Sequence, residues 1–248
     1  MNFIKKIIPN KIKLEGKYFL MSLLKIPYNR QGLPLEIQEW LPNDKPMTFI
    51  DVGASVGIFS QIVSNYYTVE HGIIVEPLAN HIPVLHSKFP DKKKYSIFNV
   101  AISESAGESD FYTFDNFDFN SSFLKIKREL MQLPGFEKKE EIALKVKTDK
   151  LDNLTSESGI GQIDLLKIDV QGAEHMVLHS GKNTLKRTKL VYIEFSYRPL
   201  YEGSSTFFDL YKIMTDNQFR LVNITPGFKG KDGELLQGDA LFVNNLLR

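Results

Sequence analysis

The chain has 248 residues, of which 42% are hydrophobic and 25% charged, and its net charge is +1. This length and composition suit one α/β domain with a sizeable core and exclude global disorder. The near-neutral charge argues against nucleic acid as the main partner, and the lack of cysteine excludes disulfides and thiolate metal sites. We expect a cytoplasmic protein.

The N-terminal segment is basic as well as apolar. Lysines at positions 5, 6, 11, 13, 17 and 25 interrupt its apolar runs, so it is too broken for a signal peptide or a membrane-spanning helix. We expect residues 1–45 to form a helical cap packed on the main domain. A basic helix lying on a membrane or a partner is the second interpretation.

From Pro46 onward, short apolar runs alternate with helical periodicity, which is typical of βαβ units and a parallel sheet. The periodicity predicts a helix after the first, second, fourth and fifth strands. The last two strands flank a turn-rich stretch and predict an antiparallel pair. The expected strands cover residues 47–51, 71–77, 95–103, 165–170, 189–196, 219–225 and 239–245.

An insertion at residues 109–150 does not fit this alternation. Two strand-like runs, SDFYTF and ALKVKT, flank a charged middle. A long insertion in an α/β domain is more often a lid or binding loop than a passive connection. The aromatic, Asp and Asn side chains of DFYTFDNFDFNSSF could contact a sugar-like acceptor, and an ordinary hairpin with an exposed tip is an equal alternative.

Gly53 and Gly57 lie between the first strand and the helix expected after it. Glycine lets the backbone turn tightly there and approach a ligand at the helix N-terminus. Glu76 ends the second strand, where a carboxylate can bind both ribose hydroxyls of an adenosine. Alone, the glycines could form a simple turn and Glu76 could be an exposed acid before Pro77; together they favour a nucleoside-containing cofactor. The G-x-x-x-G spacing favours S-adenosylmethionine over NAD.

Several segments occur along the chain in a definite order: FIDVGASVGIFS, VEP, NVAISESAGESDFYTF, LDNL, DLLKIDVQGAEHMVLHSG, VYIEFS and GDALFV. Their order resembles that of the FkbM-type methyltransferases, which belong to the class I, S-adenosylmethionine-dependent superfamily. The resemblance implies a Rossmann-like α/β methyltransferase domain over residues 46–248. Its sheet would have seven mostly parallel strands with an antiparallel last strand, and helices would cover both faces.

The resemblance also implies transfer of a methyl group from S-adenosylmethionine to a hydroxyl of a sugar, glycan or natural product. Two positions depart from the family pattern: Ser55 stands where an Asn is usual, and Gln171 stands where an acid is usual. Any role that needs a negative charge at position 171 is thereby weakened. The positions that would bind the cofactor are Asp51, Gly53, Ala54, Ser55, Gly57, Glu76, Pro77, Ala101, Ile102 and Asp169.

Three carboxylates near the ends of the fourth and fifth strands are candidate catalytic bases. Asp169 is the first candidate, as a base or as the group that orients the acceptor; a bond to the cofactor's methionine end or to the neighbouring turn is almost as plausible. Glu174 is the second, although the helix dipole also explains an acid in a first turn. Glu194 is the third. Lys167 alternates with core-facing residues, so we expect it to pair with an acid.

Alternatives to this assignment stay open. His175 and His179 have metal-ligand spacing on a helix, but nothing nearby completes a site, so we expect no metal. The G-x-S-x-G elbow of serine hydrolases is absent. An NAD(P)-dependent oxidoreductase is one alternative, and an inactive nucleoside-binding protein, supported by the neutral Gln171, is the other. We expect the partner to be a small-molecule or glycan acceptor and not nucleic acid.

Overall fold

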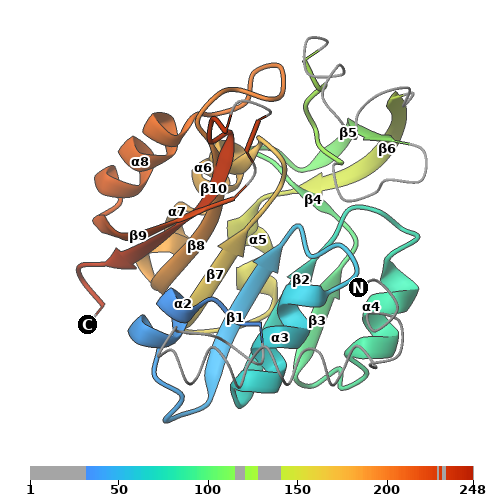
Figure 1. Cartoon of the computed structure of the whole chain (residues 1–248). Coiled ribbons are helices and arrows are strands. Elements are labelled where there is room, and N and C mark those ends of the chain that lie inside the picture. The colour runs from blue at the N-terminus through green and yellow to red at the C-terminus, as the bar shows by residue number, and fades with distance from the viewer. Residues whose placement is uncertain (1–31, 115–120, 128–140, 228, 231–232, 248) are drawn as a thin grey trace, which may run out of the picture.

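The computed structural model describes residues 32–114, 121–127, 141–227, 229–230 and 233–247. These residues form a central sheet with helices on both faces and a smaller sheet beside it (Figure 1). Most of the expected N-terminal cap and the middle of the expected insertion lie outside the described residues. Within these ranges, no helix is both long and apolar enough to cross a membrane.

The central sheet has seven strands in the order β3-β2-β1-β7-β8-β10-β9. Within it, β10 runs antiparallel to both of its neighbours, and the other pairs are parallel. This confirms the predicted fold class. The strands are β1 (Met47–Val52), β2 (Val69–Val75), β3 (Tyr95–Phe98), β7 (Ile163–Ile168), β8 (Thr188–Ser196), β9 (Phe219–Pro226) and β10 (Gln237–Asn244).

The strand order reverses between β1 and β7. From β1 the chain adds β2 and β3 on one side, and then returns to place β7 and β8 on the other. Asp51 pairs with Lys167, and Val52 with Ile168, so the two strands end next to each other. Ligand clefts of open α/β sheets form at the carboxyl ends of strands at such a switch point.

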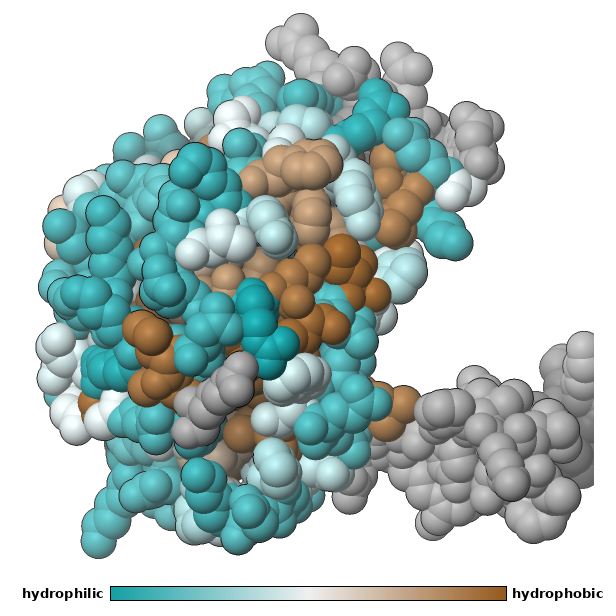
Figure 2. Space-filling model, turned by 90° about the vertical axis from the view of Figure 1, so that its left-hand side faces the viewer, coloured by the Kyte–Doolittle hydropathy of each residue, from teal (hydrophilic) through white to brown (hydrophobic). Residues whose placement is uncertain are grey.

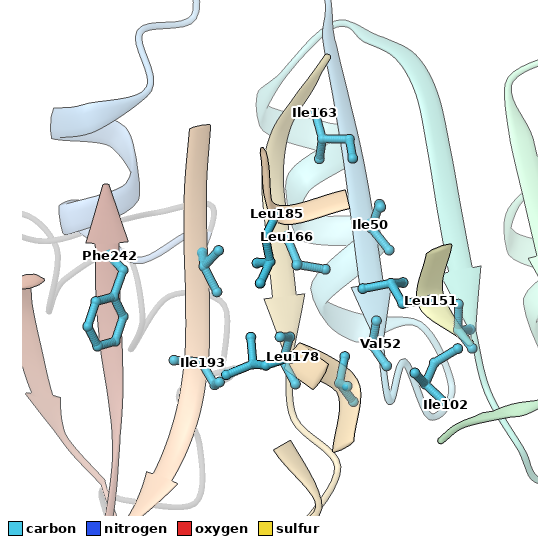
Figure 3. Close-up of a cluster of buried hydrophobic side chains, with 14 of the residues drawn as sticks. Ile50, Val52, Ile102, Leu151, Ile163, Leu166, Leu178, Leu185, Ile193 and Phe242 are labelled. Atoms are coloured by element: carbon cyan, nitrogen blue, oxygen red, sulfur yellow. The ribbon is translucent and has the colours of Figure 1, made fainter. Parts of the chain in front are cut away.

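Side-chain alternation along the strands divides the core into two layers. In β1, Ile50 and Val52 point to one face, and Met47 and Phe49 point to the other. Figure 3 shows the first layer, where Ile50 and Val52 lie near side chains from neighbouring strands and from the covering helices. The helices of that layer are α5 (Leu151–Glu157), α6 (Glu174–Ser180), α7 (Lys182–Lys186) and α8 (Phe207–Asp216). The other face carries α2 (Leu35–Trp40), α3 (Ile58–Tyr66) and α4 (Ile82–Lys88).

Helix α2 is the described helix of the expected N-terminal cap. Leu33, Ile37 and Leu41 are buried and belong to the same cluster as Phe49 of β1. Each such side chain contributes roughly 1.5–3 kcal/mol when it is fully buried. The region around α2 therefore packs directly on the sheet, while the prediction for residues 1–31 lies outside the described residues.

The third expected strand, 95–103, is wrong in its extent. It stops at Phe98 because its neighbour β2 ends at Val75, which pairs with Phe98. The side-chain amide of Asn99 then donates to the carbonyl oxygens of Glu76 and Pro77 (3.0 and 2.8 Å) and turns the chain away.

After this turn, β4 (Ala101–Ile102) joins a second sheet of order β4-β6-β5. Its other members are β5 (Gly107–Phe114) and β6 (Glu141–Asp149), which pair in antiparallel fashion. These two strands contain the SDFYTF and ALKVKT runs, so both strand predictions for the insertion are confirmed.

Helices α5 and α7 were not among the helices predicted from the sequence. They are joined by Asp152, whose carboxylate accepts hydrogen bonds from the backbone amides of Asn183 and Thr184 (3.0 and 2.8 Å). This link across the sequence, and not local propensity, positions the two helices.

The side of the molecule that carries α8 and β9 exposes several apolar side chains. Phe208 and Tyr211 of α8 and Ile224 of β9 are among the exposed large hydrophobic residues. Figure 2 looks at this side and shows hydrophobic side chains gathered in its upper part among hydrophilic ones. This edge of the sheet, opposite to β3, therefore presents apolar as well as polar surface.

Candidate functional site

The glycine loop joins β1 to α3 through three positive φ angles. Gly53 has φ +78°, Ser55 +50° and Gly57 +76°. A Cβ atom added to Gly53 would lie 1.8 Å from the carbonyl oxygen of Asp169. Glycine is therefore required at position 53, because the loops that follow β1 and β7 come into contact there.

Glu76 follows β2 and bonds to the glycine loop. Its carboxylate accepts hydrogen bonds from the backbone amides of Ser55 (2.7 Å) and Leu78 (2.9 Å), and His81 Nδ1 lies 3.3 Å from the same carboxylate. Glu76 is only 4% exposed, yet it lines a cleft at the ends of the strands. The structure thus brings together the two features that suggested a nucleoside site.

A cleft lies at the carboxyl ends of β1, β2 and β7. Its walls are largely apolar. Two of the aromatic side chains that line it are Phe111 of the second sheet and Phe123 of the insertion, which meet edge to face with ring centroids 5.5 Å apart. The carboxylates of Glu76 and Asp169 both line it. The lining residues are Val52, Gly53, Ser55, Val75, Glu76, Pro77, Val100, Ala101, Ile102, Phe111, Ser121, Phe123, Asp169, Val170 and Gln171.

Three residues predicted to bind the cofactor do not line this cleft. Ala54 is buried behind the loop, and Gly57 faces Leu85 and Phe89, which an added Cβ would approach to 2.7 and 2.8 Å. Asp51 is fully buried and accepts a hydrogen bond from the Ser60 hydroxyl (2.6 Å). These residues support the shape of the loop from behind.

Lys167 connects the glycine loop with the acids around it. Its ammonium lies 3.3 Å from Asp51 Oδ1 and 3.4 Å from Asp169 Oδ2, and it donates to the carbonyl oxygen of Gly53 (3.1 Å). Burial opposes the charge of Lys167, but the carboxylates of Asp51 and Asp169 outweigh that effect and raise its pKa. The prediction that Lys167 pairs with an acid is confirmed.

Asp169 and Glu194 meet through the side chain of Gln171. The amide nitrogen of Gln171 lies 2.9 Å from Asp169 Oδ1 and 2.9 Å from Glu194 Oε2. Its amide oxygen accepts a hydrogen bond from the Tyr201 hydroxyl (2.9 Å). Burial, followed by the charge of Asp169, raises the pKa of Glu194 well above its ordinary value.

Glu174 bonds to the backbone of the loop between β7 and α6. Its carboxylate accepts hydrogen bonds from the backbone amides of Val170 (3.2 Å) and Gly172 (3.0 Å) and does not line the cleft. Burial raises the pKa of Glu174 to about 7, despite those bonds. The residue holds the loop between β7 and α6.

The family model of the methyltransferase FkbM domain matches residues 51–221, which include the glycine loop, Glu76, Asp169 and Glu194. The chain belongs to the FkbM methyltransferase family. It is 34% identical over 146 residues to the 2-O-methyltransferase NoeI of Sinorhizobium fredii (strain NBRC 101917 / NGR234), a match that covers 56% of this chain and 58% of NoeI. The matched region therefore spans less than two thirds of that relative.

Two solved structures resemble the fold of this FkbM-family chain. One is the methyltransferase FkbM from Methylobacillus flagellatus KT, with a TM-score of 0.51 and 12% identity over 80% of this chain and 43% of that one. The other is the MTase domain of METTL16, with a TM-score of 0.50 and 9% identity over 85% of this chain and 65% of that one. At these identities the likeness shows the fold alone.

The two histidines with metal-ligand spacing in this FkbM-family chain, His175 and His179, do not line the cleft. His179 Nδ1 is 3.0 Å from Glu104 Oε1, and the His175 ring meets the His179 ring edge to face. In the part of the chain that the structure describes, no group of three or more His, Asp or Glu side chains could hold a metal ion.

Sequence reasoning missed two residues beside the candidate acids. Tyr201 lies in the loop after β8, where no periodicity or motif marks it, and Gln237 at the start of β10 donates to Glu194 Oε2 (3.2 Å). Both residues are distant in sequence from the acids and reach them only in the folded structure. For Phe123 the sequence contained a weak indication of a binding role, since this residue ends the aromatic-rich stretch of the insertion.

Proposed function

We propose that the chain is an S-adenosylmethionine-dependent O-methyltransferase that acts on a hydroxyl of a saccharide or natural-product-like acceptor. The observation that carries the proposal is that one cleft at the switch point is lined by both Glu76 and Asp169. Membership of the FkbM methyltransferase family supports methyl transfer. The similarity to NoeI, a 2-O-methyltransferase, supports a hydroxyl acceptor.

The residues of the cleft fit this cofactor. Glu76 Oε2 accepts the backbone amide of Ser55, and a carboxylate oxygen has a second lone pair with which to accept a ribose hydroxyl. Oε1 accepts the backbone amide of Leu78 and also lies 3.3 Å from His81 Nδ1. Apolar walls that include Ala101, Ile102 and Phe111 would contact the adenine. The carboxylate and the apolar wall thus supply the two kinds of contact that an adenosine needs.

When bound, S-adenosylmethionine supplies an electrophilic methyl group. The residues of the chain position the acceptor and remove its proton, and Asp169 is the group that takes that proton. Its side chain is 36% exposed and lines the cleft, while Lys167 contacts its Oδ2 atom and Gln171 its Oδ1 atom. A base in this place contributes about 10²–10⁴-fold to the rate.

Calorimetry on the full chain separates this proposal from an oxidoreductase. S-Adenosylmethionine and its demethylated product should both give binding heats, and NAD should give none. The absence of heat with both sulfur ligands would contradict the proposal. Binding heat in a protein that transfers no labelled methyl group to any hydroxyl compound of a glycan and metabolite library would favour the inactive binding protein.

A further inference from the structure

The loop that carries Gln171 is held from several sides. The Glu174 carboxylate binds the backbone amides before and after position 171, and the Ser122 hydroxyl donates to the Gln171 carbonyl oxygen (2.7 Å). Gln171 itself has φ +54°, a left-handed conformation that is uncommon for a residue other than glycine. The backbone therefore fixes the position of Gln171 independently of its side chain.

The chemistry of its partners orients the Gln171 side chain. Asp169 and Glu194 present carboxylate oxygens, which require donors, so the amide nitrogen faces them. The amide oxygen then faces Tyr201, whose hydroxyl can donate. Both hydrogens of the amide and its oxygen are thus used, each in a contact of 2.9 Å.

Charge explains why a neutral residue suits this position. Glu194 is buried, and the charge of Lys167 acts against the repulsion from the surrounding acids. A neutral donor lets two carboxylates approach one side chain without adding a further negative charge. The charged groups that act on Glu194 are Asp169, Glu174, Asp239 and Lys167, and the Tyr201 hydroxyl is affected by Glu194 in turn.

We propose that Gln171 is a positioning residue whose amide holds Asp169 and Glu194 side by side and directs Asp169 into the cleft, with Tyr201 fixing the amide. The role assigned to Asp169 rests on the proposed function. The arrangement of Asp169, Gln171, Glu194 and Tyr201, which we call the Gln171 clip, does not depend on cofactor or acceptor.

Carbon-13 NMR titration of labelled Asp and Glu carboxyl groups in the full chain tests the clip. Asp169→Asn and Glu194→Gln assign the two signals. In Gln171→Asn, which suits a left-handed conformation but is too short to bridge both acids, the titration midpoint of Asp169 should rise because its ionised form loses a donor. In Gln171→Glu, the added carboxylate should raise the midpoints of Asp169 and Glu194 further, by about 1–2 pH units.

Gln237→Met is the matched control, because Gln237 donates to Glu194 and has no hydrogen bond to Asp169. It should raise the Glu194 midpoint, which loses a donor, and should not raise that of Asp169. An Asp169 midpoint that stays at its wild-type value in both Gln171→Asn and Gln171→Glu would overturn the clip. Wild-type circular dichroism in these variants shows that a shift does not come from unfolding.

Turnover supplies the second readout and separates the two proposals. With an acceptor in hand, the acid limb of the kcat–pH profile should move in each Gln171 variant in step with the Asp169 midpoint. A limb that does not move overturns the positioning role. Failure of wild-type protein to bind S-adenosylmethionine in calorimetry would instead contradict the proposed function, while the NMR titration would still decide the clip.

Discussion

The ammonium of Lys167 donates a hydrogen bond across 3.1 Å to the carbonyl oxygen of Gly53, so a buried cation on β7 ties that strand to the glycine loop. The same ammonium lies within 3.4 Å of Asp51 and Asp169. The Lys167 side chain therefore connects the glycine loop to the candidate base Asp169. Its removal should affect the stability of the loop and the position of Asp169.

Lys167→Met should destabilise the protein by about 3–5 kcal/mol, because Asp51 would remain buried without its cation. Urea unfolding measures the change. Adding Asp51→Asn to Lys167→Met should recover part of the loss. Lys212→Met, at an exposed pair with Asp216, is the control and should change stability little; equal losses at both lysines would contradict the account.

Gly53→Ala should be more damaging than its φ angle alone explains. Gly203 has nearly the same φ, +76° against +78°, but nothing lies within 4 Å of a Cβ added there. Gly203→Ala should therefore cost only the left-handed conformation, about 1–2 kcal/mol. Gly53→Ala adds a collision with the Asp169 carbonyl oxygen, so its loss of unfolding free energy should be clearly larger, and similar losses would show that the two loops are not in contact.

Glu76→Gln should weaken S-adenosylmethionine binding about 10–100-fold, since hydrogen bonds to a charged group contribute about 1.5–3 kcal/mol. Asp169→Asn provides the comparison: calorimetry should find its affinity near that of the wild type while turnover is lost. If Glu76→Gln binds the cofactor as tightly as the wild type, the ribose is not held at the end of β2.

Glu174→Gln should stabilise the protein increasingly as the pH rises. The pKa of Glu174 is raised from 4.5 to about 7 in the folded state, so the folded chain keeps a proton that the unfolded chain loses between those values. Between pH 4.5 and about 7, the free energy of unfolding of the wild type should therefore fall by about 3 kcal/mol relative to that of the variant. Above that range the difference between the two proteins should stay constant. Urea unfolding at several pH values checks this, and a pH-independent difference would refute it.

The sequence predicted the sheet well because most of the elements that carry it are marked locally. Apolar runs end at Asp51, Glu76 and Asp169, and the antiparallel closing pair follows from the turn-rich stretch between its strands. The third strand could not be bounded in this way, since its end depends on the distant backbone that Asn99 binds.

The acidic residues of the candidate site could be predicted from the sequence, but the hydrogen bonds that connect them could not. Strand ends indicated Asp169 and Glu194, and the core position of Lys167 indicated an ion pair. The contact between Tyr201 and Gln171 spans 30 positions and leaves no periodic signal in the sequence. The orientation of Glu174 into its own loop was likewise visible only once the backbone amides around it were placed.

Transfer of a labelled methyl group from S-adenosylmethionine into a library of glycans and hydroxyl-bearing metabolites, with wild-type protein and Asp169→Asn side by side, tests the central claim most directly. We predict that the wild type labels a hydroxyl compound and that the variant, although it still binds the cofactor, does not. Equal labelling by both proteins would contradict the role of Asp169, and labelling of none of the acceptors by wild-type protein would contradict O-methyl transfer itself.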